Sequence, residues 1–432
     1  MGAAESSRRL AGQVTPTVTA DPDRSRQVDL FDPDTQECPY NAYQLLREIG
    51  PWLDPRSEMF ILSRYEDIRE VLVDPERFPS GGRIGTGKTD RLLEVYRSEG
   101  GWVPARTLAG RDDPEHRQLR KLFQHAFRPS RIDALESEIR DLAHTLIDGF
   151  VEEGRCDWVR QFAVPLPLIV IGRQMGAEES DIWRIKAWTD AWVQRLGMMQ
   201  TEEEAIRSTQ MEVEAQKYFQ PIFERLRAQP DDTLLSDLVN TEVPGWGRPM
   251  NDNELHAEMM ADTFVGGSET STNALSAGMM LLIQSPDQWR RLKTEPELVL
   301  PTLVEEVLRL ESPVQGLFRT AAVDSEIGGV LIPAGSRLNL RYAAANRDDS
   351  VFDDPDRFDA GREEARNHLA FGFGAHYCLG APLARRELLV GFRAMVERLD
   401  EIWFVDGAND FAHHPNFVLR ALKELHIGFT PA

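Results

Sequence analysis

The residues best suited to do chemistry lie in one glycine-punctuated segment, residues 371–380. Its single cysteine, Cys378, comes just before a helical pattern, and the N-terminus of a helix supplies the backbone N–H donors that a metal-binding thiolate needs. Gly374 and Gly380 permit tight turns and let the backbone lie against a flat macrocycle, where a Cβ atom would clash. His376 can meet an anionic group on the same side as the sulfur. Cys378 therefore lies where a metal-binding thiolate would find its donors, and the alternative is a buried structural cysteine in a turn.

Two adjacent glycines, Gly266 and Gly267, lie near the middle of the longest helical pattern, residues 254–283. Together they cost a helix roughly 2 kcal/mol relative to alanine, so a sequence shaped for stability alone would avoid them. They predict a local bulge where the backbone hydrogen bonds open. The alternative is close packing of this helix against a neighbour, with the following Glu269 in solvent.

Helical periodicity dominates the elements that must position these groups. The predicted helices cover residues 114–127, 131–153, 178–196, 202–228, 254–283, 296–310 and 382–399. Strand patterns are few and short, at residues 59–63, 329–332 and 337–341, with a turn between the last two. Residues 1–30 are predicted to form a disordered tail and residues 31–432 a single domain. A long polar loop is predicted between Gly81 and the first of these helices, and such loops are often functional.

The composition argues against several classes of protein. The chain has 432 residues, of which 41% are hydrophobic, and its formal net charge is −22, so a phosphate backbone would repel it. The three cysteines form no C-x-x-C pair, which argues against a zinc site and a disulfide framework. The most apolar run, residues 162–171, is about half as long as a membrane-spanning helix. The N-terminal residues lack the apolar core of a secretory signal, and together these features predict a cytoplasmic protein.

The segment 371–380 fills every defined position of the pattern F-G-x-G-x-H-x-C-x-G, and it resembles the haem-binding loop of the cytochrome P450 superfamily. The resemblance implies a soluble bacterial-type member with haem b as cofactor and Cys378 as the axial iron ligand. It also implies the fold of that family, mainly α with small β-sheets (α+β), in one haem-thiolate catalytic domain over residues 31–432. The haem would then lie between an oxygen-binding helix and the helix that follows the cysteine loop.

Two further segments resemble parts of the same family that brace the haem loop. Glu306 and Arg309 form an E-x-x-R motif and share one helical face, where they can pair. Arg357, in the segment 353–358, resembles the arginine that completes a Glu–Arg–Arg network in the family. We expect the three side chains to form a buried ionic cluster, in which loss of one member costs about 3–5 kcal/mol.

Four basic residues are expected at the haem propionates. His116 and Arg120 lie at i and i+4 of one predicted helix, in a segment similar to the propionate-binding helix of the family. Arg319 occupies the position of another propionate ligand, and His376 supplies a fourth. Guanidinium groups match carboxylates in geometry, although any one of these residues could instead be a solvated surface charge.

The helix that carries the two glycines matches the oxygen-binding helix of the family. The resemblance implies a groove for dioxygen there, with Thr270 as the hydroxyl that delivers protons and Glu269 as its acidic neighbour. The implied activity is monooxygenation, which inserts one oxygen atom from O2 into a hydrophobic small molecule by hydroxylation or epoxidation. The alternatives are a peroxygenase driven by hydrogen peroxide, a non-oxygenating haem-thiolate enzyme and a haem sensor.

Electrons are expected from a separate ferredoxin or flavodoxin with an NAD(P)H-dependent reductase, because no flavin or iron–sulfur segment is visible in the chain. Four basic side chains around the first predicted helix would form a docking patch for such an acidic carrier, unless they are only a solvated face. They are Arg117, Lys121, Arg128 and Arg131.

Position in the family pattern also indicates the substrate pocket. The candidates are Val265 and Gly266 on the oxygen-binding helix, and Val314 and Leu317 after the E-x-x-R helix. These residues are apolar, so we expect a neutral, hydrophobic substrate and no membrane or nucleic-acid partner. Arginines in the predicted loop at residues 83–106 leave a carboxylate-bearing substrate as the alternative.

Overall fold

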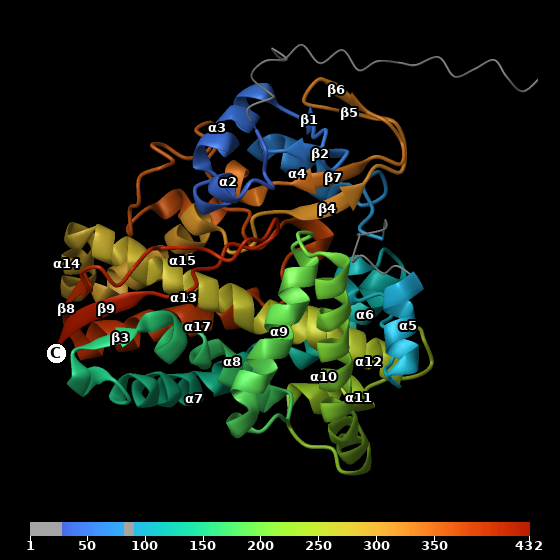
Figure 1. Ribbon diagram of the computed structural model, residues 1–432, viewed down its shortest axis with the longest axis horizontal. Coiled ribbons are helices and arrows are strands. Elements are labelled where there is room, and N and C mark those ends of the chain that lie inside the picture. The colour runs from blue at the N-terminus through green and yellow to red at the C-terminus, as the bar shows by residue number, and fades with distance from the viewer. Residues whose placement is uncertain (1–27, 82–89) are drawn as a thin grey trace, which may run out of the picture.

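The computed structural model describes residues 28–81 and 90–432, and helices dominate this part of the chain (Figure 1). The predicted fold class, mainly α with small β-sheets, is confirmed. The helices are α2 (Pro33–Glu37), α3 (Tyr40–Ile49), α4 (Tyr65–Val73), α5 (Asp90–Ser98), α6 (Glu115–Ala126), α7 (Pro129–Asp148), α8 (Pro165–Gln174), α9 (Ile182–Leu196), α10 (Glu202–Ala228), α11 (Leu234–Asn240), α12 (Asp252–Glu258), α13 (Gly266–Gln284), α14 (Pro286–Thr294), α15 (Pro296–Glu311), α16 (Tyr342–Ala345) and α17 (Ala381–Arg398).

The strands form three small sheets, ordered β1-β2-β7-β4, β3-β9-β8 and β5-β6. They are β1 (Trp52–Leu53), β2 (Met59–Leu62), β3 (Arg155–Asp157), β4 (Leu317–Thr320), β5 (Ser325–Ile327), β6 (Val330–Ile332), β7 (Arg337–Leu340), β8 (Leu399–Phe404) and β9 (His426–Pro431). Among the described strands, only β2 and β7 pair in parallel, with Met59 opposite Arg337. The strands β6 and β7 flank a short turn but belong to different sheets, because β6 pairs with β5 while β7 lies between β2 and β4.

A long central helix runs through the middle of the molecule in Figure 1. It consists of α12, a π-helical segment over Met259–Val265 and α13, which follow one another without a break. The bulge that the two glycines predicted is therefore present, and it ends at Val265. The helices α8, α15 and α17 pack against α13, so the central helix connects the cysteine loop to the rest of the core.

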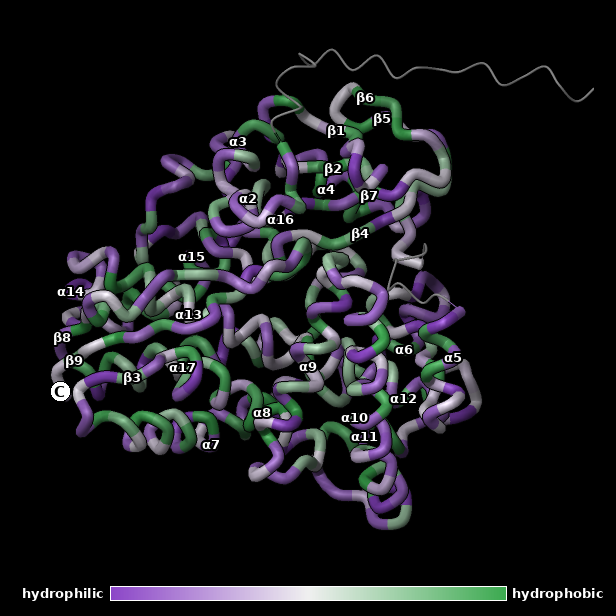
Figure 2. Tube along the Cα trace, in the orientation of Figure 1, coloured by the Kyte–Doolittle hydropathy of each residue, from purple (hydrophilic) through white to green (hydrophobic). Residues whose placement is uncertain are grey.

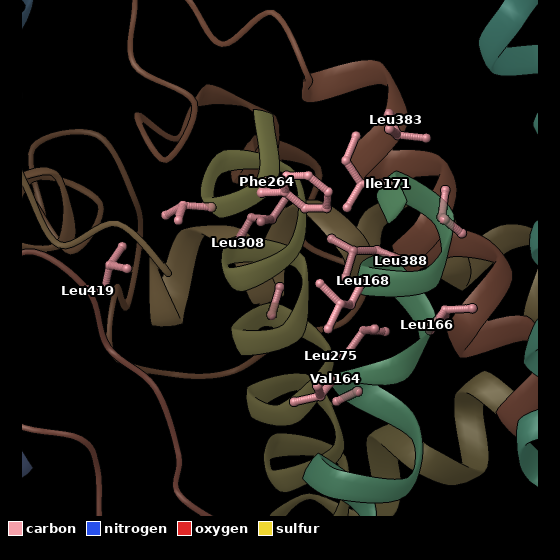
Figure 3. Close-up of a cluster of buried hydrophobic side chains, with 14 of the residues drawn as sticks. Val164, Leu166, Leu168, Ile171, Phe264, Leu275, Leu308, Leu383, Leu388 and Leu419 are labelled. Atoms are coloured by element: carbon pink, nitrogen blue, oxygen red, sulfur yellow. The ribbon is translucent and has the colours of Figure 1, made fainter. Parts of the chain in front are cut away.

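Apolar side chains fill the space where these helices meet (Figure 3). The labelled ones include Leu168 and Ile171 from α8, Phe264 and Leu275 from the central helix, and Leu388 from α17. Figure 2 shows α8 as hydrophobic along most of its length, and residues 165–172 are all buried. A helix that is apolar all round belongs in the interior of a protein, which is where α8 lies.

The structure differs from the sequence predictions at two places in the part of the chain before α6. Val28 and Leu30 are only 6% and 7% exposed, so the packed part of the chain begins by residue 28 rather than at residue 31. The other residues of the predicted tail lie outside the described part of the chain. The predicted long loop before α6 contains the helix α5, whose buried Leu92 and Tyr96 share one face. In residues 28–81 and 90–432, no helix is both long and apolar enough to cross a membrane.

Candidate functional site

Cys378 lies in a loop that folds back on itself just before α17. Its backbone N–H donates to the Phe371 carbonyl at 2.8 Å, and this bond closes the loop. Gly372 and Gly374 have positive φ angles of 68° and 73°. A Cβ atom on Gly374 would also clash with the Leu72 carbonyl oxygen, so conformation and space both require glycine at this position.

The sulfur of Cys378 faces the first amides of α17. The backbone N–H groups of Gly380 and Ala381 donate hydrogen bonds to it. Burial raises the pKa of the thiol, whereas these two amides and the nearby cations Arg120 and Arg385 oppose the increase. Gly380 has a φ of −78°, which any residue adopts, so its lack of a side chain leaves space beside the sulfur rather than permitting a turn.

Four basic side chains gather near this loop, and the Asp113 carboxylate lies 3.7 Å from Nδ1 of one of them, His116. The rings of His116 and His376 lie 3.9 Å apart between centroids. Burial, together with Arg319, His116 and Arg120, lowers the pKa of His376 to about 3. The Nε2 atom of His116 is buried and has no hydrogen-bond partner, and in the described part of the chain neither Arg120 nor Arg319 forms an ion pair. Their hydrogen bonds go to the backbone carbonyls of Tyr377 and Phe318.

The charged forms of these groups are unfavourable side by side, because like charges repel one another and desolvation adds to the cost, so the pKa of both histidines is lowered while the two arginines keep their charge. A ligand that brings carboxylates would relieve the repulsion. Of this cluster, His376 lies on the loop that carries the sulfur, and His116 and Arg120 reach that loop from α6. The loop lacks side chains at its glycines. Sulfur, cations and glycines together fit an iron porphyrin with two propionates.

The buried ionic cluster beside the loop has a different third member from the predicted one. Arg309 donates to both carboxylate oxygens of Glu306, at 2.7 and 2.9 Å, and both side chains are fully buried. The second arginine is Arg362, whose Nε lies 3.2 Å from Glu306. The prediction that Arg357 belongs to this cluster is wrong, because its side chain is 64% exposed and pairs with Asp359 at 3.0 Å. The loop turns Arg357 outwards and brings Arg362 back towards α15.

The central helix carries the residues predicted to handle oxygen. The Thr270 hydroxyl donates to the Gly266 carbonyl at 3.0 Å, four residues back along the helix. Gly266 is exposed, and a Cβ built on it would come no nearer than 4.0 Å to another atom. A Cβ on Gly267 would instead lie 3.2 Å from Ile171 Cγ1. One glycine therefore leaves space open along the helix, while the other permits close packing against α8.

Glu269 is buried and directed at α9 rather than at solvent. Its carboxylate accepts a hydrogen bond from the Thr189 hydroxyl at 2.8 Å, and Lys186 Nζ lies 3.3 Å away. Burial raises the pKa of Glu269, and Lys186 partly offsets this increase. Thr270 and Glu269 thus have separate partners. The sequence analysis missed Lys186 and Thr189, because nothing local indicates that α9 crosses the central helix at this point.

The predicted pocket residues fall on two segments. Val265 is buried at the end of the π-helical segment, next to the exposed Gly266. Val314 is half-buried and forms a β-bridge with Leu419, whereas Leu317 at the start of β4 is 37% exposed. Both segments therefore combine buried apolar side chains with open positions.

The predicted basic patch is smaller than expected. Arg131 is buried and pairs with Asp237 at 2.8 Å, and Arg128 pairs with the same carboxylate at 2.9 Å. Arg117 and Lys121 remain exposed on α6, although Arg117 also pairs with Asp113.

The chain has a helical fold, a cysteine sulfur that accepts hydrogen bonds from backbone amides, and a cluster of basic side chains beside it. Together these features define a haem-thiolate enzyme. The family model for cytochrome P450 matches residues 199–420. Steroid C26-monooxygenase of Mycobacterium tuberculosis is 32% identical over 391 residues, covering 90% of this chain and 94% of that protein. Linalool 8-monooxygenase of Pseudomonas putida is 34% identical over 415 residues, which cover 93% of this chain and 99% of that protein.

Solved structures agree with the sequence comparisons. Cytochrome P450 CYP109Q5 from Chondromyces apiculatus has 33% sequence identity and a TM-score of 0.80, covering 94% of this chain and 98% of that one. The chain belongs to the cytochrome P450 family. It is a monooxygenase with haem iron as its cofactor.

Proposed function

We propose that this chain binds haem b with Cys378 as the axial iron ligand and with His116, Arg120, Arg319 and His376 at the propionates. The cluster of basic side chains carries this proposal, because the guanidinium groups of Arg120 and Arg319 donate only to backbone carbonyls among the described residues, and a bound anion would offset their charge. The amides that point at the Cys378 sulfur support the same assignment, since they stabilise a thiolate.

The bound haem supplies the activation of dioxygen, and the residues of the chain supply order and protons. Gly266 leaves space open beside the central helix, and this space is the proposed groove for dioxygen. The Thr270 hydroxyl lies one turn further along and can rotate from the Gly266 carbonyl into that groove. Glu269 is the nearest acid in the sequence. For its carboxyl to pass a proton to this hydroxyl, it would have to leave Lys186 and Thr189 on α9.

The proposed substrate is a neutral, hydrophobic small molecule of the terpenoid or steroid class, hydroxylated or epoxidised at a C–H or C=C bond. The two relatives described above support this class, because one is a steroid monooxygenase and the other is a linalool monooxygenase. The candidate pocket residues Val265, Gly266, Val314 and Leu317 are apolar and offer no charge to bind a carboxylate.

The electrons are proposed to come from a ferredoxin or flavodoxin with an NAD(P)H-dependent reductase, which would dock near Arg117 and Lys121 on α6. A cytoplasmic location is proposed for the complex. The thiols support this location, because Cys38, Cys156 and Cys378 are all free and Cys38 is exposed, as fits a reducing compartment.

Absorption spectroscopy of the reduced, carbon monoxide-treated protein tests the ligand assignment. We expect Cys378→Ser to lose the red-shifted Soret band of a thiolate-ligated haem. Cys38→Ser and Cys156→Ser are the matched controls and should keep the band. If Cys378→Ser kept it, another ligand would hold the iron.

Titration of the ferric protein tests the substrate class. A terpenoid or steroid that displaces water from the iron should shift the Soret band to shorter wavelength. A response only to fatty or aromatic carboxylates would contradict the proposed class.

A further inference from the structure

A second polar cluster supports the cysteine loop from the side of α15 and α17. Arg385 on α17 donates to both carboxylate oxygens of Glu305, with Nε–Oε1 at 2.6 Å and Nη2–Oε2 at 2.9 Å. Its third nitrogen, Nη1, donates to the Tyr377 hydroxyl at 3.0 Å. His368 Nε2 lies 3.1 Å from the same carboxylate. Glu305 precedes Glu306 in sequence but serves a separate set of partners.

The guanidinium of Arg385 lies close to the two ends of the loop. It sits 4.6 Å from the ring centroid of Phe371, whose carbonyl accepts the backbone N–H of Cys378. It also bonds to the side chain of Tyr377, which directly precedes Cys378. Arg385 follows Ala381 by one helical turn, and the Ala381 amide donates to the sulfur. The positive charge of Arg385 therefore lies against the loop that carries Cys378, and it opposes the increase that burial causes in the pKa of the Cys378 thiol.

Glu305 is the residue that neutralises this charge. The Nδ1 atom of His368 accepts the Ala370 backbone N–H at 3.1 Å, so its proton is on Nε2 and the ring is a neutral donor to Glu305. Burial would raise the pKa of Glu305, but the hydrogen bonds from Arg385 and His368 outweigh it and lower the pKa to about 2. The Glu305–Arg385 pair is thus fully ionised at neutral pH.

We propose that Glu305 and Arg385 are positioning residues that set the charge beside the Cys378 sulfur and thereby the reduction potential of the iron. The inference rests on the proposed ligation by Cys378. A cation beside the thiolate favours the reduced state, which carries one more negative charge, and a carboxylate bonded to that cation weakens its field. Removal of either partner therefore changes the potential, in opposite directions.

Redox titration of the ferric–ferrous couple in three variants of the haem-loaded protein tests the proposal. Glu305→Gln leaves the charge of Arg385 uncompensated, so the potential should rise. Arg385→Gln leaves the charge of Glu305 uncompensated, so the potential should fall. The double variant removes both charges and should return close to the wild-type value. Loosening of the loop alone would move both single variants in the same direction, and that result, or no shift at all, would overturn the proposal.

The same two helices offer a matched control. Arg393 on α17 pairs with Glu297 on α15 through two hydrogen bonds, as Arg385 pairs with Glu305, but further from the loop. Glu297→Gln and Arg393→Gln should leave the potential unchanged, and shifts equal to those of the inner pair would overturn the proposal. The carbon monoxide complex of each variant separates this test from the ligand assignment. A thiolate-type band in the Glu305 and Arg385 variants shows that the sulfur still binds iron, whereas only the Cys378 variant addresses the ligation itself.

Discussion

Burial sets the protonation state of single residues around this site, and Glu387 on α17 is the clearest case. Its side chain is 0% exposed, and the only hydrogen bond found for it in the described part of the chain comes from the Ser271 hydroxyl at 2.7 Å. Burial raises the pKa of this carboxyl to about 8, and the Ser271 hydroxyl offsets only part of the increase. The folded protein therefore keeps Glu387 protonated at neutral pH, whereas the unfolded chain ionises it above about pH 4.3.

This difference makes the stability depend on pH. Because the folded state binds one more proton, the free energy of unfolding should fall by about 1.4 kcal/mol per pH unit from about pH 4.3 to about pH 8, and then level off. Glu387→Gln removes the titrating group. Between pH 6 and pH 8, the free energy of unfolding of the variant should therefore increase by about 2 kcal/mol relative to that of the wild type. Urea unfolding of the holoenzyme measures this difference. Equal pH slopes for the two proteins would contradict the raised pKa.

At the residue scale, the sequence predicts well where a regular element fixes the spacing. His116 and Arg120 lie one helical turn apart, and the structure brings them together with His376. A loop gives no such spacing, so the sequence offered no means to choose Arg362 over Arg357. Lys186 was out of reach for another reason: it approaches Glu269 from a helix more than 80 residues earlier in the chain.

At the scale of elements, the loop before the cysteine is held to α15 by the Glu306–Arg309–Arg362 cluster. Arg362→Gln removes one charge from a buried network, so we expect unfolding free energy to fall by about 3–5 kcal/mol. Arg357→Gln changes an exposed arginine five residues earlier and should cost less than about 0.5 kcal/mol. Chemical denaturation of both holoenzyme variants makes the comparison. If the Arg357 variant lost more stability than the Arg362 variant, the original assignment of the network would be restored.

The central helix gives a second test at this scale, because its two glycines have different surroundings. Gly266→Ala adds a methyl group to open space, so helix propensity should stabilise the protein by about 0.5–1 kcal/mol while the methyl blocks the groove and lowers turnover. Gly267→Ala instead presses on Ile171 and should not stabilise. Thermal unfolding and product formation are measured for both variants. Unchanged turnover in the Gly266 variant would show that the groove lies elsewhere.

Long amphipathic elements were the part of the fold that the sequence predicted best. Periodicity over many residues marks α7, α10 and α15, and their predicted ends differ from the structure by a few residues at most. The helix α5 is not predicted, because its nine residues are too few to establish a helical period within a polar stretch. The separation of β6 and β7 into two sheets depends on β2, more than 260 residues earlier in the chain, and no local turn signal contains that information.

At the scale of the whole molecule, α5, α9 and α10 pack together on one side of the central helix (Figure 1). A buried network joins them: the Tyr96 hydroxyl on α5 donates to Glu212 on α10 at 2.7 Å, and Arg195 on α9 pairs with the same carboxylate. Arg195 also donates to the Tyr96 hydroxyl at 3.2 Å and to Thr209 at 3.1 Å. Because α9 also carries the partners of Glu269, the outer helices are connected through α9 to the central helix.

Tyr96→Phe removes one hydroxyl from this network and leaves the Arg195–Glu212 pair in place. A hydrogen bond to a charged group contributes about 1.5–3 kcal/mol, so local opening of α5 should become about 10-fold or more easier. Amide hydrogen exchange over residues 90–98 should rise accordingly, and release of a bound substrate should become faster. Arg184→Gln, which removes an exposed ion pair with Glu214 between α9 and α10, is the control and should change neither. If exchange in α5 did not respond to Tyr96→Phe, apolar packing alone would hold α5 in place, and the polar network would serve only to pair α9 with α10.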